Sequence, residues 1–179
     1  MSESISISPN ISFDQALEKS GKLVEMIANG DLSESQIEEI VSLLVASVNG
    51  SRSFFANYLT TDYDFANTPS PAILKALSSS STIVSDILVK NLAMSTASAL
   101  THQRNGDLEQ SAGSLIVQQR TLNLLSLLKL PESGEKISSL ALTIKNGTGD
   151  YQGFLERWGY DTEQKEAIAK ALVDVIMGI

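Results

Sequence analysis

Few residues of this chain could carry out chemistry. One histidine and no cysteine among 179 residues exclude His-dependent triads, Cys–His pairs, thiolate metal sites and disulfides within one chain. The Asp62-x-Asp64 pair lacks the later glycine and glutamate of a calcium loop. The glycine-rich stretch 146–154 lacks the Gly-Lys-Ser/Thr ending of a phosphate loop. We therefore predict no catalytic residues, no metal and no cofactor, although a carboxylate-based enzyme stays open because acidic residues can meet anywhere in the fold.

The ten aromatic residues are distributed unevenly. Five lie between residues 50 and 65, four lie between 151 and 160, and residues 66–150 contain none. Arg52 and Arg157 each lie next to such a cluster, and arginine with Tyr or Trp is typical of interfaces. We predict a partner or ligand patch made of Arg52, Phe55, Tyr58, Asp62, Tyr63, Tyr151, Arg157, Trp158 and Tyr160. The alternative is that the phenylalanines fill the core and the tyrosines lie at its rim.

Composition excludes one class of partner and indicates a compartment. The formal net charge is −8 and no cluster of Lys and Arg exists, so we expect no nucleic-acid surface. Residues 1–11 contain no basic residue and no apolar run of signal length, and we interpret them as a flexible tail without a targeting signal. The absence of cysteine fits a reducing compartment, and we expect a cytoplasmic protein.

Apolar residues repeat near every 3.6 positions through most of the chain, which predicts helices. Ser12 with Gln15 and Ser33 with Gln36 form capping-box patterns. Four Asn-Gly pairs, at 29/30, 49/50, 105/106 and 146/147, predict left-handed helix ends. We expect helices over 12–29, 33–48, 51–60, 71–77, 82–104, 107–128, 135–146, 150–158 and 162–177.

The fold class follows from these patterns. No window alternates like a strand apart from SISIS near the start, so we predict an all-α bundle of six to eight helices. It forms a single domain over residues 12–179, with a central apolar helix near 82–104. That helix carries Asp86 and Lys90 and several Ser, Thr and Asn residues, which favours a core helix over a transmembrane segment.

The helix over 107–128 is apolar on more than one side. We expect its inner face to carry Leu108, Ala112, Leu115, Leu122 and Leu125. Residues 122–130 are apolar nearly all round, which indicates deep burial or an oligomer contact. We therefore expect a homodimer.

Three segments, VNGSRSFFANYLTTD, LVKNLAMSTASAL and FLERWGYD, resemble uncharacterised all-helical proteins of cyanobacteria. The resemblance implies a soluble protein of a photosynthetic cell, and it brings no activity, cofactor or site residue. The missing cysteine excludes covalent bilin attachment. We predict a non-enzymatic helical protein that binds another protein or itself, as an assembly or regulatory factor. The alternative is a carrier or sensor that binds an apolar small molecule between helices.

Overall fold

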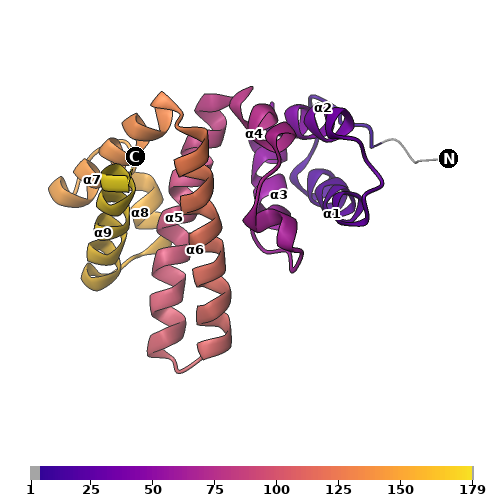
Figure 1. The fold of residues 1–179 in the computed structure, drawn as a ribbon. Helices are drawn as coiled ribbons and strands as arrows, with labels where there is room; N and C mark the ends of the chain where they lie inside the picture. The colour runs from indigo at the N-terminus through magenta and orange to yellow at the C-terminus, as the bar shows by residue number, and fades with distance from the viewer. Residues whose placement is uncertain (1–4, 179) are drawn as a thin grey trace. The chain divides into compact units, whose positions relative to one another are not determined.

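The computed structural model describes residues 5–178, and every regular element in them is helical (Figure 1). The all-α class is therefore confirmed. The described residues contain nine α-helices, one more than the predicted six to eight, and each of the nine segments expected to be helical overlaps one of them. The elements are α1 (Phe13–Asn29), α2 (Glu34–Val45), α3 (Val48–Tyr58), the 3-10 helix η1 (Asp64–Asn67), α4 (Pro71–Ser78), α5 (Ser81–Arg104), α6 (Leu108–Leu128), α7 (Pro131–Asn146), α8 (Gln152–Trp158) and α9 (Thr162–Gly178).

The chain divides into two compact units, Met1–Ile87 and Leu88–Ile179, and the boundary falls inside α5. The first unit contains α1 to α4 and the first residues of α5, and the second contains the rest of α5 and α6 to α9. The single domain over residues 12–179 stays a prediction.

Helix ends follow the predicted signals at most positions. Both capping boxes are present. In each, the serine hydroxyl accepts a hydrogen bond from the backbone N–H of the glutamine, and the glutamine side-chain oxygen accepts one from the backbone N–H of the serine. Three of the four Asn-Gly pairs end a helix with the glycine in the left-handed region, at Gly30 (φ 73°), Gly106 (φ 74°) and Gly147 (φ 73°). These signals are local, which explains why the sequence alone identifies them.

The prediction at Asn49-Gly50 is wrong, because Gly50 lies inside α3. Helix α2 ends earlier than expected, and the Ser47 hydroxyl caps α3 by accepting a hydrogen bond from the Gly50 amide at 3.1 Å. Val48, the last residue of the helix expected over 33–48, is the first residue of α3 and is 57% exposed. A Cβ atom at Gly50 would lie 2.0 Å from the carbonyl oxygen of Leu44. Glycine is therefore required here for the close approach of two helices and not for a positive φ.

The core of the first unit forms where α1 packs on α3, and where α2 packs on α3 and α4. Ser53 and Asn57 of α3 also donate hydrogen bonds to backbone carbonyls of α1, at 3.1 and 3.0 Å. Residues 1–4 of the expected tail lie outside the described residues. Ile11 at its other end is only 4% exposed, and its carbonyl accepts a hydrogen bond from Asn49. The fully buried large side chains of this unit include Leu23, Leu44, Phe54, Phe55, Tyr58, Leu59, Ile73 and Leu77.

In the second unit, α5 and α6 form an antiparallel pair, and α9 packs against α6 and α7 (Figure 1). The Ser111 hydroxyl donates to the Ala99 carbonyl at 3.1 Å, and the Gln118 amide donates to the Thr96 hydroxyl at 2.8 Å. By length and composition α5 could cross a membrane, but 61% of its most apolar window is buried inside the protein. This burial agrees with its interpretation as a core helix. The core of this unit includes Leu92, Leu124, Leu125, Ile137, Leu140, Ile168 and Leu172.

Candidate interaction surfaces

The first aromatic cluster, in the first unit, is mainly core. Phe54 stacks on Tyr58 with ring centroids 5.2 Å apart and contacts Phe55 edge-on at 5.3 Å. Phe55 and Tyr58, both predicted patch residues, are 1% and 0% exposed. Because a partner cannot reach them in this fold, these two residues belong to the core alternative.

The other predicted residues of this cluster lie at the surface. Arg52, Asp62 and Tyr63 are exposed. The Arg52 guanidinium lies over the ring of Phe13 in α1, 5.0 Å from its centroid. This is cation–π geometry with an aromatic residue far away in sequence, whereas the sequence suggested a pairing with the adjacent phenylalanines.

The second aromatic cluster, in the second unit, combines buried and exposed rings. Tyr151 is 4% exposed, and the Lys90 ammonium lies 5.8 Å from its ring centroid. Phe154 makes edge contacts with Tyr151 and Tyr160, each at 6.2 Å. Burial raises the pKa of Tyr160 to about 12, and the neutral phenol can donate a hydrogen bond.

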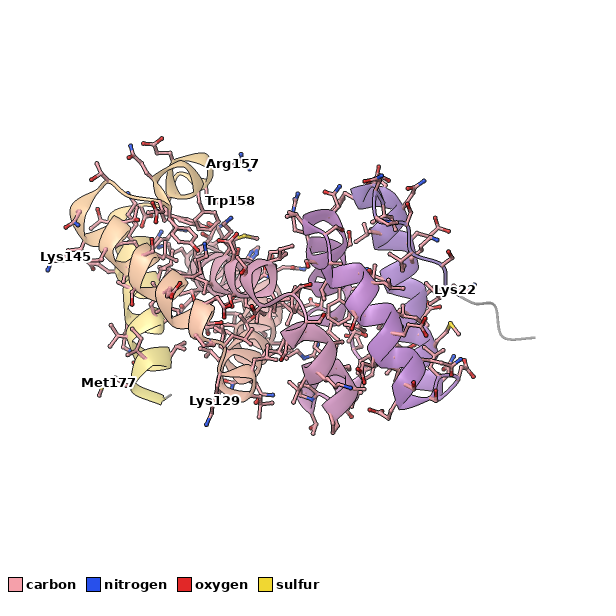
Figure 2. All side chains as sticks on the ribbon, turned by 90° about the horizontal axis from the view of Figure 1, so that it is seen from above. Lys22, Lys129, Lys145, Arg157, Trp158 and Met177 are labelled. Atoms are coloured by element: carbon pink, nitrogen blue, oxygen red, sulfur yellow. The ribbon has the colours of Figure 1, made fainter. Side chains whose placement is uncertain are left out.

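Arg157 and Trp158, also predicted patch residues, lie at the end of α8 and are both exposed (Figure 2). Trp158 is 53% exposed, which leaves much of its indole available to a partner. The residues of the predicted patch thus come from two different units, with Arg52 to Tyr63 in the first and Tyr151 to Tyr160 in the second.

A pocket of about 260 Å³ lies beside this second cluster, between the ends of α7 and α8 and the start of α9. Glu156 and Lys165 bring opposite charges to its wall, and Ile144 and Leu155 bring apolar surface. The Gln152 amide donates to the Glu156 carboxylate at 2.8 Å. The lining is therefore mixed in character, and the full set is Thr143, Ile144, Gly147, Gln152, Leu155, Glu156, Gly159, Tyr160 and Lys165.

The largest departure from the sequence prediction is on α6. Leu108 and Leu115, expected on its inner face, are 71% and 50% exposed, and Ile116 is 51% exposed. Ala112 is exposed as well. We call these four residues the α6 stripe, because spacings of four, three and one place them on one side of a helix. Leu125, predicted to be inward, is fully buried.

Hydrogen bonding to α5 explains this orientation. Ser111 and Gln118 are seven residues apart, so they lie on one side of α6, and both side chains bond to α5. Further along α6, the buried Leu125, seven residues after Gln118, continues on that side. A helix with apolar residues on two sides gives no periodic signal for which side is buried. Here the small and polar side faces α5 and the apolar stripe faces solvent.

The family of the chain can now be stated. Residues 12–175 match the family described as Uncharacterised conserved protein UCP020893. The chain belongs to this family. No curated protein and no solved structure matches it. The prediction of an uncharacterised family is therefore confirmed.

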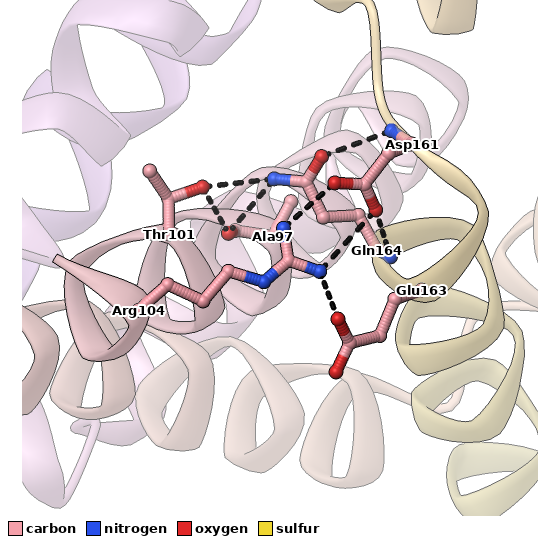
Figure 3. Close-up of polar contacts among 6 residues, drawn as sticks. All are labelled: Ala97, Thr101, Arg104, Asp161, Glu163 and Gln164. Atoms are coloured by element: carbon pink, nitrogen blue, oxygen red, sulfur yellow. Dashed lines mark hydrogen bonds and ion pairs between the residues drawn. The ribbon is translucent and has the colours of Figure 1, made fainter.

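A polar cluster of this family member, which the sequence did not predict, joins the end of α5 to the start of α9 (Figure 3). Arg104 forms ion pairs with Asp161, at 2.7 Å, and with Glu163. The Gln164 amide donates to the Thr101 hydroxyl at 2.8 Å and to the Ala97 carbonyl at 3.3 Å. Because 57 residues separate Arg104 from Asp161, no local pattern in the sequence could reveal this cluster.

The cluster shifts the pKa of its own groups. Hydrogen bonding from Arg104 holds the pKa of the Asp161 carboxyl below its ordinary value of 3.8, and the two carboxylates raise the pKa of Arg104. A depressed carboxyl pKa stabilises the fold at pH values above the ordinary pKa. This stabilisation is lost as the pH falls through the lowered value.

We therefore expect Arg104→Gln to lower the melting temperature at neutral pH and low salt, because it removes both ion pairs. The difference from wild type should shrink in high salt, since both carboxylates are exposed and screened. It should also shrink below about pH 4, where Asp161 of the variant becomes protonated. Thermal unfolding followed by circular dichroism tests this, with the exposed Arg157→Gln as matched control. Equal melting temperatures for wild type and Arg104→Gln at low salt would contradict it.

Between residues 5 and 178, the acidic side chains lie away from the core and do not form a group that could hold a metal ion. No Asp or Glu in that range is buried, although burial is the usual way to raise a carboxyl pKa for acid catalysis. Nor does any group of three or more His, Asp or Glu residues there have the placement to hold a metal ion.

Proposed function

We propose that this protein is a non-enzymatic helical protein that acts by binding another protein, as an assembly or regulatory factor, through the α6 stripe. The carrying observation is the exposure of Leu108, Leu115 and Ile116 on one side of a helix whose other side is already packed. Large apolar side chains at such spacing are the anchors by which a helix docks into an apolar groove or onto another helix.

The surroundings of the acidic residues support the non-enzymatic part of the proposal. No Asp or Glu in residues 5–178 is buried, and most of them are exposed. Shifted pKa values often mark catalytic sites, but at Arg104 and Asp161 an ion pair between two helices accounts for them. The cytoplasmic location and the cyanobacterial source stay predictions from the sequence.

A charge placed in the stripe tests the proposal. We expect Leu115→Glu to abolish partner capture from a native lysate, because a carboxylate at the centre of a desolvated contact is costly. The matched control is Leu142→Glu, at an apolar α7 position that is 56% exposed. Both variants should keep the wild-type helical content. Capture that is equally strong with both variants would contradict a role for the stripe.

The pocket beside Tyr160 supports the second candidate function, a small-molecule carrier or sensor. Its volume of about 260 Å³ suits a small ligand. Glu156 and Lys165 in its wall favour a molecule with polar groups over the purely apolar one that we expected from the sequence. Native mass spectrometry of the protein purified from its own cells distinguishes the two functions. A bound mass that disappears in Tyr160→Ala supports the carrier, and an unmodified mass of one chain alone counts against it.

A further inference from the structure

We infer that the partner of the α6 stripe is a second copy of this chain, with the two α6 helices packed antiparallel about Ala112. This inference rests on the proposed function, and it names the partner and the geometry. It follows from three features of α6, namely its charge, its orientation and the sizes of its exposed side chains.

The charge distribution leaves few places where two copies can meet. Each chain carries a net charge of −8, so most mutual approaches of two copies are repulsive. Residues 110–119, QSAGSLIVQQ, contain no charged residue, and three of the four residues of the α6 stripe, Ala112, Leu115 and Ile116, lie in this segment. Two acidic chains can bury this segment against each other without desolvating a carboxylate.

The charges that flank this segment select the orientation. Asp107 and Glu109 lie at its N-terminal end, and both are exposed. In a parallel pair, each of these carboxylates would lie beside the same carboxylate of the other chain, and two like charges so close together are unfavourable. In an antiparallel pair centred on Ala112, the two copies of Asp107 are about 15 Å apart along the helices, given a rise of about 1.5 Å per residue. The helix dipoles also oppose each other in this orientation.

The side-chain sizes also match in the antiparallel pair, in which a two-fold rotation relates the two helices. Leu108 and Ile116 are each four residues from Ala112, so Leu108 of one copy faces Ile116 of the other, with Leu115 next to it. Small residues lie at the centre, where Ala112 is followed by Gly113. A Cβ atom at Gly113 would meet nothing within 4 Å. The two helices can therefore approach closely at the axis, with larger apolar side chains interlocking on either side.

The cysteine-free sequence permits a direct test, because a single introduced cysteine can form a disulfide only with the same cysteine of a second chain. We expect Ala112→Cys to form a covalent dimer under mild oxidation, since a disulfide requires Cα atoms within about 7 Å and the axis brings these two together. The matched control is Leu127→Cys, on the same helix and 48% exposed before substitution. In the antiparallel pair its two copies are about 45 Å apart along the helices, so it should form no covalent dimer.

The outcomes separate this inference from the proposed function. Light scattering of the purified wild type should give twice the 19.2 kDa of one chain, and Leu115→Glu should give a single-chain mass. Adding Leu115→Glu to Ala112→Cys should remove the covalent dimer. Crosslinking of both cysteine variants would overturn the antiparallel geometry, and a single-chain mass for wild type with no crosslink at Ala112→Cys would overturn the second copy. In that last case, the wild type could still capture another protein from a lysate. If Leu115→Glu abolishes this capture, the proposed function holds with a partner other than a second copy.

Discussion

Replacing Gly50 with alanine is expected to destabilise the protein by about 3 kcal/mol. An alanine Cβ atom would lie 2.0 Å from the carbonyl oxygen of Leu44 and 2.8 Å from its carbonyl carbon. Both are backbone atoms of the preceding helix, so a rotamer change cannot relieve the overlap. The junction of α2 and α3 would have to open, and the packing of Phe54 and Phe55, which follow on α3 and are buried, would loosen with it. Urea unfolding measures the loss as a lower midpoint.

The matched control for this substitution is Gly134→Ala. Gly134 also lies inside an α-helix, α7, but nothing lies within 4 Å of the Cβ atom that alanine would add. We expect it to stabilise the protein by about 0.5–1 kcal/mol, because alanine has the higher helix propensity and loses less backbone entropy on folding. Similar urea midpoints for the two variants would show that the close approach at Gly50 has no energetic consequence.

Features that depend on a few neighbouring residues were predictable from the sequence. The capping boxes that begin α1 and α2, and the glycines that end three helices, have local causes and are present as predicted. At Gly50 the same reasoning failed, since the local pattern of Asn before Gly cannot show that a carbonyl six residues earlier approaches this position. The sequence does not distinguish a glycine that is needed for a positive φ from a glycine that is needed because another part of the backbone lies too close for a Cβ atom.

The buried side of α6 shows a second limit. Its apolar residues give a consistent stripe, and the sequence analysis placed three of the four stripe residues, Leu108, Ala112 and Leu115, on the inner face. The structure places Ser111 and Gln118 there, because their side chains find acceptors on α5. Hydrophobic burial favours either side of such a helix to a similar extent, so hydrogen-bond partners on another helix decide the orientation.

Contacts between distant residues account for what was missed at the candidate sites. The cation that lies over Phe13 comes from Arg52 on another helix, and the carboxylates that bind Arg104 come from the start of α9. The sequence did indicate that Arg52 and the aromatic residues belong together. It could not show which rings lie in the core and which reach the surface, since that depends on how α1, α2 and α3 pack.

Replacing Phe55 with alanine should cost about 3–5 kcal/mol of folding free energy, the range for large aromatic residues in a core. The ring is 1% exposed and packs edge-on against Phe54 with centroids 5.3 Å apart. Its removal would leave a cavity that the neighbouring rings cannot fill without losing their own contacts. Urea or thermal unfolding followed by circular dichroism measures the cost.

The control within the same cluster is Tyr63→Ala. Tyr63 is 43% exposed and stacks on Phe65 with centroids 6.3 Å apart, so we expect its truncation to cost less than about 1 kcal/mol. If Tyr63→Ala is folded and loses partner capture, the exposed part of this cluster contributes to binding. Loss of capture in Phe55→Ala, by contrast, would report unfolding, because a partner cannot reach a ring that is buried in the native state. A Phe55→Ala protein as stable as wild type would contradict the placement of this residue in the core.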